Sequence, residues 1–147
     1  MTAVLAASEV LKQLETRFPG AVTASTDTVI TVDSKSLLPV MMYLKTAPGL
    51  DFSYLTTITA IDYFQYFEIV YFLVSMEHNH TLTIKTRAYG RDDPKVPSVG
   101  SLWRSADHQE REIYDLMGVT FEGHPNMKRI VLWPEFKGHP QRKDFLK

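Results

Sequence analysis

Histidine offers this chain its most versatile chemistry, and two of the five histidines, His78 and His80, stand two positions apart. An extended backbone would place both on one face, where they could ligate a metal ion. The sequence shows no third ligand close to them, and Glu77–His80 has the polar character of a hairpin loop. A polar loop tip is therefore favoured over a metal site.

His124 and His139 occur in two copies of one tripeptide, Gly123–Pro125 and Gly138–Pro140. Histidine titrates near neutrality, so the pair could act as acid and base or as ligands. Gly-x-Pro is also typical of a turn, in which the histidine forms hydrogen bonds that hold the chain. The turn is the favoured interpretation.

The acidic run Glu110-Arg111-Glu112 lies in a predicted helix, where Glu110 and Glu112 project about 200° apart and cannot form a catalytic dyad. A solvated helix face or a salt bridge between subunits is favoured instead. The sequence contains no glycine-rich phosphate loop, no nucleophile elbow and no dinucleotide fingerprint. These residue patterns favour a binding or scaffolding domain.

The amino-acid composition excludes further classes of site and of protein. The absence of cysteine excludes disulfides, thiolate zinc sites and cysteine-held iron–sulfur clusters, and fits a cytoplasmic protein. With 16 basic against 17 acidic residues, binding to nucleic acid through bulk charge is not expected. The longest apolar run, Ile69–Val74, is far shorter than the ~18–20 residues that span a bilayer, and Met1–Ser8 lacks a basic signal segment. We expect a soluble or peripheral protein that meets the membrane only through a partner.

Hydrophobic periodicity predicts an α+β fold. The expected elements are a helix over residues 1–18 with Val4 on its apolar face, a hairpin over 22–32, a helix from a Ser36 cap to Pro48, and strands over 52–61, 67–76 and 81–87. This order, α-β-β-α-β-β-β, predicts a two-layer core whose sheet is largely antiparallel, with helices packed on one face.

A third helix is predicted from a Ser105 cap to Met117, with Gly118 as its left-handed C-cap. Its polar side would carry the ion pairs Asp107–Arg111 and Arg111–Asp115. We expect one domain made of an α+β core (1–90), a connector with the third helix (91–118) and an extended C-terminal arm (119–147).

The arm has too many glycines and prolines for a long helix or a central strand, yet it carries large apolar side chains that are costly to leave in water. It also carries six basic groups against two acidic ones between residues 128 and 147. We therefore expect it to lie across another surface, with Phe121 and Ile130 packing back on the domain first.

The segments Glu110–Val119 (EREIYDLMGV), Phe121–Pro125 (FEGHP), Arg129-Ile130 and Gly138–Asp144 (GHPQRKD), in this order, resemble the complex I 30 kDa subunit family of respiratory NADH dehydrogenase. Leu55–Tyr63 resembles the strand of that family that ends in Asp-Tyr, and Val96–Ser98 resembles its pre-helix connector.

The resemblance implies a non-catalytic peripheral-arm subunit of an NADH:quinone oxidoreductase, which scaffolds the large quinone-site subunit during electron transfer coupled to proton translocation. The implied partners are that large, hydrogenase-like subunit and neighbouring iron–sulfur subunits, on the cytoplasmic side of the cell membrane. This chain would bind no cofactor and no metal, whereas the parent complex would use NADH, FMN, iron–sulfur clusters and quinone. The residues expected at the partner interface are Glu110, Arg111, Glu112, Asp115, Glu122, His124, Arg129, Trp133, His139, Arg142, Lys143 and Asp144.

Two departures from the family pattern keep alternatives open. His108 stands where many members have an aromatic residue, and the sequence stops three residues after Asp144, where respiratory members often continue. A subunit of a membrane-bound hydrogenase or formate-oxidising complex is therefore an alternative. A free-standing enzyme that uses the histidines to bind a metal is a third.

Overall fold

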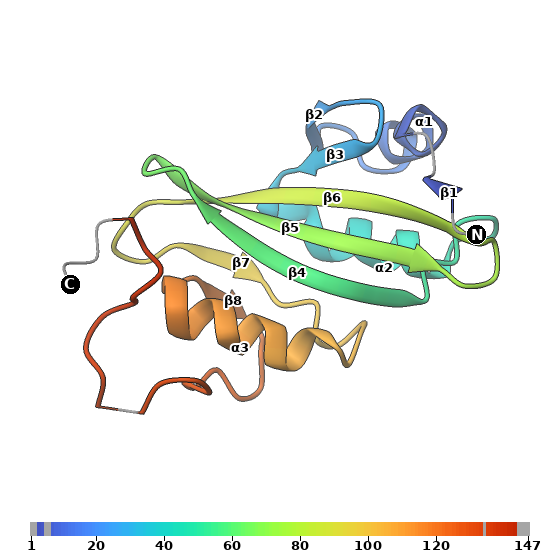
Figure 1. Ribbon diagram of the computed structural model, residues 1–147. Coiled ribbons are helices and arrows are strands. Elements are labelled where there is room, and N and C mark those ends of the chain that lie inside the picture. The colour runs from blue at the N-terminus through green and yellow to red at the C-terminus, as the bar shows by residue number, and fades with distance from the viewer. Residues whose placement is uncertain (1–2, 5–6, 134, 144–147) are drawn as a thin grey trace.

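The computed structural model describes residues 3–4, 7–133 and 135–143 of the chain. Its α+β architecture confirms the predicted fold class (Figure 1). In chain order, its elements are β1 (Ala3–Val4), α1 (Ala7–Arg17), β2 (Val22–Ser25), β3 (Val29–Val32), η1 (Ser34–Ser36), α2 (Leu37–Thr46), β4 (Tyr54–Asp62), β5 (Tyr66–Ser75), β6 (His80–Tyr89), β7 (Lys95–Pro97), α3 (Ala106–Met117) and β8 (Thr120–Glu122).

The main sheet has the strand order β2-β3-β6-β5-β4, with β1 beside β6. Strands β4, β5 and β6 form an antiparallel meander, but β3 and β1 both pair with β6 in parallel. The sheet is therefore mixed, although most of its paired residues, including the predicted β2–β3 hairpin, are antiparallel as expected. The reason is topological, because the chain passes through α2, β4 and β5 before it returns beside β3 as β6.

The core lies between the sheet and α2, which buries Leu37, Val40, Met41 and Leu44 (Figure 1). Pro39 lies in the first turn of α2, where its missing N–H costs no helical hydrogen bond. β6 buries Leu82 and Ile84 and leaves the alternate residues half-exposed, as its alternating sequence predicts.

The N-terminal prediction needs a correction. Helix α1 begins at Ala7, and Val4 belongs to the short strand β1, where it pairs with Thr81. Val4 matched the predicted helix only because its position happens to agree with the helical spacing of the apolar residues that follow it.

A second, two-stranded sheet was not predicted. β7 and β8 pair in parallel on either side of α3 in the sequence, with Val96 opposite Phe121, and both side chains are buried. Phe121 thus packs back on the domain as expected. Three-residue strands carry too little periodicity to be recognised in a sequence.

Helix α3 ends at Gly118 with φ +79°, which confirms the predicted C-cap. Its start also lies where predicted, with Ser105 at the N-cap position, but the Ser105 side chain does not form the capping hydrogen bond. Instead, the side chains of Ser105 and Gln109 form hydrogen bonds with backbone groups at the edge of β4. Ser105 Oγ donates to the Leu55 carbonyl at 2.7 Å, and the Ile58 N–H donates to Gln109 Oε1 at 2.7 Å. α3 therefore covers a sheet edge that would otherwise expose unpaired backbone groups.

Candidate partner interface

The carboxylate of Asp115 is the centre of the junction between α3 and the arm, and it is fully buried. Arg129 Nη1 donates to Asp115 Oδ1 at 2.5 Å. The backbone N–H groups of Ile130, Val131 and Leu132 donate to Oδ2 at 3.1, 2.7 and 2.8 Å. Burial raises the pKa of Asp115, but these hydrogen bonds outweigh it and hold the pKa below its ordinary value. One ionised carboxylate thus fixes the conformation of the segment from Arg129 to Leu132.

Further contacts tie the arm to the same helix. The Asp115 carbonyl accepts from Arg129 Nη1 at 3.1 Å and from His139 Nδ1 at 2.9 Å. Arg111 donates to the carbonyls of Lys128 and Arg129 at 3.2 and 3.3 Å. The predicted helical pair Arg111–Asp115 is therefore wrong, because Asp115 pairs with Arg129 and Arg111 with the backbone of the arm.

Glu110 is also fully buried, so the expected solvated position for this residue is wrong. Its carboxyl accepts from Ser98 Oγ at 2.6 Å and from the Val99 N–H at 2.9 Å. Burial raises its pKa to about 7, although both hydrogen bonds act in the opposite direction. A sequence signal for this burial exists, because Glu110 falls at helical spacing between the buried residues Ala106, Ile113 and Met117.

The end of the arm is attached to Asp62, a buried carboxylate at the end of β4. Arg91 donates to both of its oxygens at 2.5 and 2.9 Å, and the Lys143 N–H donates to Oδ2 at 3.0 Å. The Arg91 guanidinium holds the pKa of Asp62 well below its usual range. Arg142 donates to the carbonyls of Met117 and Arg91 at 2.5 and 2.9 Å. The guanidinium of Arg142, expected to contact a partner, is thus held by backbone of its own chain.

The two Gly-His-Pro segments do not form an acid–base pair. Near the start of α3, His124 Nε2 lies 2.7 Å from Asp107 Oδ1, and the Asn126 N–H donates to His124 Nδ1 at 2.9 Å. Asp107 therefore faces His124 rather than Arg111. His139 contacts the other end of α3, and burial lowers its pKa. Each histidine holds a turn of the arm against the helix.

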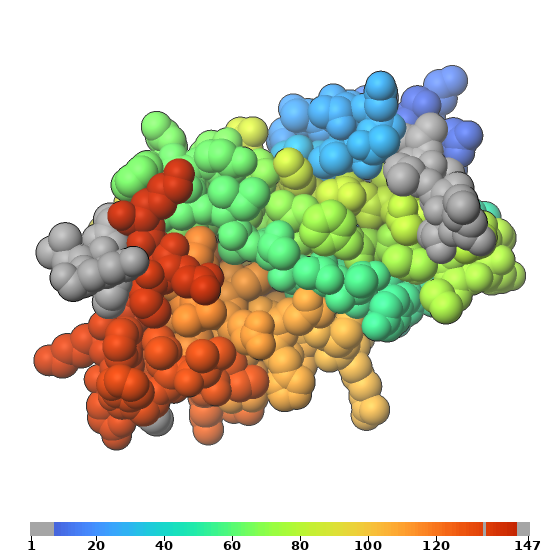
Figure 2. Space-filling view, in the orientation of Figure 1, coloured from blue at the N-terminus to red at the C-terminus, as the bar shows by residue number. Residues whose placement is uncertain are grey.

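The predicted interface residues therefore divide into two sets. The first set forms contacts within the chain and comprises Glu110, Arg111, Asp115, His124, Arg129, His139 and Arg142. The second set is exposed and includes Trp133, whose side chain is 60% exposed. Its neighbours Val131 and Ile130 are 57% and 37% exposed, so Ile130 packs on the domain less than expected. Glu112, Glu122 and Lys143 are also exposed, while Asp144 lies outside the described residues. Figure 2 shows the arm, in red, spread against α3, in orange.

Among the described residues, the candidate metal ligands that gather are Asp51, Glu77 and His78, whose ligand atoms lie within 4.8 Å of one another. His78 Nε2 is 2.7 Å from Asp51 Oδ2, while His80 instead contacts the Leu50 carbonyl at 3.2 Å. The group lies at the surface, where such clusters are common without an ion, so it supports no metal assignment.

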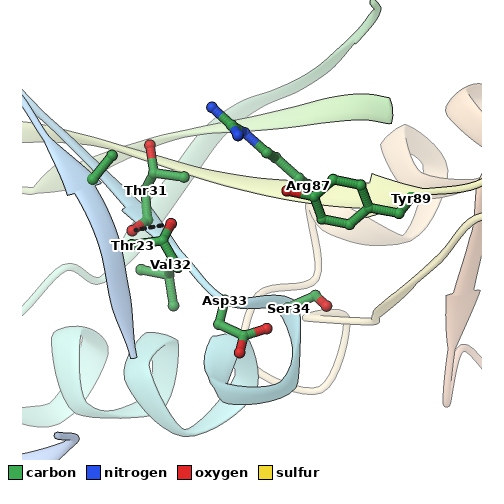
Figure 3. Close-up of a pocket in the computed structure, with 8 residues that line it drawn as sticks. Thr23, Thr31, Val32, Asp33, Ser34, Arg87 and Tyr89 are labelled. Atoms are coloured by element: carbon green, nitrogen blue, oxygen red, sulfur yellow. Dashed lines mark hydrogen bonds between the residues drawn. The ribbon is translucent and has the colours of Figure 1, made fainter. Parts of the chain in front are cut away.

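A hollow of about 280 Å³ beside β2, β3 and β6 is shown in Figure 3. Its polar lining includes Asp33, Ser34 and Arg87, and in this view Arg87 points away from Asp33. Asp33 accepts from the Lys35 N–H and Thr23 Oγ1 donates to the Thr31 carbonyl, so these polar groups of the hollow serve its own backbone and show no catalytic arrangement.

The comparisons with known proteins agree with this anatomy. Residues 30–147 match the family "Respiratory-chain NADH dehydrogenase, 30 Kd subunit". The chain belongs to this family. The match includes β4, α3 and the whole arm, which are the elements that the buried carboxylates join.

One relative is a subunit of the NADH-quinone oxidoreductase of Rhizobium meliloti (strain 1021), 39% identical over 117 residues, which are 78% of this chain and 63% of that protein. Another is the mitochondrial "NADH-ubiquinone oxidoreductase 30.4 kDa subunit" of Neurospora crassa, 40% identical over 119 residues, which are 79% of this chain and 41% of that protein. The chain thus spans less than two thirds of either relative.

Two solved structures share the fold. The trypsin-resistant fragment (1–134) of Nqo5 is 27% identical with a TM-score of 0.66, covering 82% of this chain and 98% of the fragment. The membrane-bound sulfane sulfur reductase (MBS) is described as an archaeal respiratory membrane complex. Its matching chain is 28% identical with a TM-score of 0.75, covering 95% of this chain and 85% of that one. In the described part of this chain, no helix is long and apolar enough to cross a membrane.

Proposed function

We propose that this chain is a non-catalytic subunit of a complex I-like NADH:quinone oxidoreductase, in which it scaffolds the large quinone-site subunit. Neighbouring iron–sulfur subunits are further proposed partners, and the location is the cytoplasmic side of the cell membrane. The chain itself would bind no cofactor, while NADH, FMN, iron–sulfur clusters and quinone would belong to its partners. Family membership and the names of the relatives support this proposal.

The observation that carries the proposal is a rigidly held apolar loop. Asp115 fixes the backbone of residues 130–132, and the loop exposes Val131 and Trp133. Trp133 packs edge-to-face on Phe136 at 5.1 Å between ring centroids, which orients the indole. An exposed tryptophan that needs little ordering on binding is typical of the residues that anchor protein interfaces.

The proposal can be tested by purifying a tagged chain from its source cells with the complex attached. Replacing Val131 by serine and Trp133 by alanine should reduce the large subunit recovered by about tenfold or more. The matched control is Met76→Ser, which removes another exposed apolar side chain at the far β5–β6 turn. Unchanged recovery with the double variant would contradict the role of the loop. Wild-type protein that recovers no large subunit would contradict the function itself.

The similarity to MBS favours a second candidate, a subunit of a membrane-bound complex with another electron donor or acceptor, such as a hydrogenase or formate-oxidising complex. The catalytic subunits that co-purify distinguish the two candidates. Flavin-containing NADH-oxidising subunits support the first, and a hydrogenase or formate-oxidising module supports the second.

A further inference from the structure

We propose that an acidic segment of a neighbouring subunit binds at one corner of the sheet, where exposed aromatic rings and cationic side chains gather. The aromatic corner, as we name it, consists of the β4–β5 turn, the ends of β5 and β6, and the end of the arm. Its members are Ile61, Tyr63, Phe64, Tyr66, Arg87, Tyr89, Arg91 and Lys143. This inference rests on the proposed function, because it takes the chain to be part of a complex.

Phe64 is the first evidence that the corner serves binding rather than folding. Its backbone has φ +67°, in the left-handed region where bulky residues are strained, and its side chain is 51% exposed. Glycine or asparagine would adopt this conformation at lower cost. The chain therefore keeps a strained aromatic residue whose ring stays half-exposed, with the cations Arg91 and Lys143 near it. A residue type that fits its backbone conformation poorly is typical of functional sites.

The rings and cations of the corner form a connected set. Tyr66 lies 5.3 Å from Tyr63 and 5.7 Å from Tyr89, measured between ring centroids, and the Arg87 guanidinium stands 4.4 Å from the Tyr66 ring. Tyr63 is 39% exposed and Tyr89 65%. Neighbouring tyrosine rings that pack at tilted angles present a large contact area with few rotatable bonds, so binding costs them little conformational entropy.

Charge identifies the occupant. The carboxylates of Asp62 and Glu68 are buried, and each already pairs with a cation, Asp62 with Arg91 and Glu68 with Lys85 at 3.0 Å. Around Phe64, both Arg91 and Lys143 stand 5.5 Å from the ring. Apart from the aliphatic Ile61, the exposed members of the corner are therefore aromatic or cationic. A segment rich in aspartate or glutamate complements them, because its carboxylates can meet the cations over the rings.

The corner is also continuous with the arm. The Lys143 N–H is bound to Asp62, so the last described part of the arm lies beside the β4–β5 turn, and Figure 1 shows both at the same end of the molecule. A partner that engages the apolar loop at Trp133 and follows the arm would reach the corner. Cation–ring contacts also occur elsewhere, as between Arg17 and Tyr43, but among the described residues the exposed rings of Tyr54 and Phe72 have none.

A stability measurement combined with an assembly measurement tests the proposal on the full chain. Phe64→Asn should leave the thermal midpoint of the isolated chain unchanged or raise it, because asparagine relieves the strain. The same variant, tagged and expressed in source cells, should recover about tenfold less of the complex than wild type. Lys143→Glu should also lower recovery, and Met76→Asn, at the opposite turn, should not. Normal assembly of Phe64→Asn would overturn the proposal.

Photo-crosslinking from position 89, with benzoylphenylalanine in place of Tyr89, identifies the occupant in the assembled complex. The expected product joins position 89 to an acidic peptide of one neighbouring subunit. Products confined to lipid, to a second copy of this chain or to a peptide without acidic residues would overturn the proposal. If Phe64→Asn assembles normally while the Val131 and Trp133 double variant does not, the corner proposal fails and the proposed function stands. If wild-type chain recovers no complex, the proposed function fails.

Discussion

The carboxylate of Asp115 and the guanidinium of Arg129 form an ion pair inside the chain, with Arg129 Nη1 2.5 Å from Asp115 Oδ1. The same carboxylate accepts three consecutive backbone N–H groups, from Ile130 to Leu132. A segment without regular secondary structure thereby obtains the hydrogen bonds that its backbone needs. The arm is consequently an integral part of the domain, and its backbone at residues 130–132 is held in place before any partner binds.

Replacing Asp115 by asparagine should destabilise the chain strongly. The neutral amide can no longer balance Arg129, and it accepts fewer of the four hydrogen bonds, so a loss of about 3–5 kcal/mol is expected in the free energy of unfolding. Urea unfolding followed by circular dichroism measures this loss. Glu112→Gln, an exposed carboxylate on the same helix, is the control and should change stability by less than about 0.5 kcal/mol. Equal effects of the two substitutions would show that the pair contributes nothing.

Glu110 predicts a stability that falls as pH rises. In the folded chain its pKa is raised to about 7, whereas in the unfolded chain the carboxyl ionises near 4.5. Between these pH values the unfolded chain releases its proton first, so the free energy of unfolding decreases, by on the order of 3 kcal/mol in total. Glu110→Gln should remove most of this decrease, as seen in urea unfolding at pH 4.5, 6 and 8.

One result would contradict the predicted pH dependence of Glu110. If wild type and Glu110→Gln have parallel stability profiles between pH 4.5 and 8, the buried carboxyl does not titrate as described. Below pH 4 both proteins should lose stability together. Asp62 and Asp115 have pKa values below their ordinary 3.8, so the stabilisation from their charge is lost only as pH falls through this acidic range.

Much of the local structure could be predicted from the sequence because it depends on local patterns. The helical spacing of Leu37, Val40, Met41 and Leu44 marks α2, and Gly118 marks the end of α3. The alternation in β6 likewise separates its buried face from its exposed face. These features depend on only a few neighbouring residues, so they could be predicted without knowledge of the topology or of distant contacts.

The site was harder to predict, because its contacts join segments far apart in the sequence. Nothing near Asp62 in the chain indicates that Arg91 and the Lys143 backbone will meet it. Charged residues such as Glu110 and Asp115 look solvated until the arm and the β7–α3 connector cover them. Arg91, Ser98 and Gln109 were missed for the same reason. Only Glu110, in register with the buried residues Ala106, Ile113 and Met117, left a readable signal.

Gly118→Ala should loosen the arm as well as strain the helix end. Gly118 has φ +79°, and a Cβ there would lie 2.6 Å from Arg142 Nη2 and 2.7 Å from His139 Cδ2. Gly20→Ala is a matched control, because Gly20 has φ +81° and no atom within 4 Å of the added Cβ. Both variants should lose about 1 kcal/mol or more from the backbone conformation. Only Gly118→Ala should also speed trypsin cleavage in the arm, and equal cleavage rates would place the arm away from Gly118.

Removing residues 126–147 should destabilise the chain rather than release an intact core. The truncation takes away Arg129 and the backbone N–H groups that bind Asp115, and it takes away the Lys143 N–H that binds Asp62. Asp115 would remain as an unpaired buried charge, at a cost of about 3–5 kcal/mol. Adding Asp115→Asn to the truncated chain should then restore part of the stability, although the same substitution destabilises the full-length chain. In urea unfolding, the substitution would thus change the free energy of unfolding in opposite directions in the two chains. This result is specific to a buried charge that the arm stabilises, because the loss of packing alone would make both chains less stable. Additive losses in the two chains would mean that water, rather than the arm, solvates Asp115.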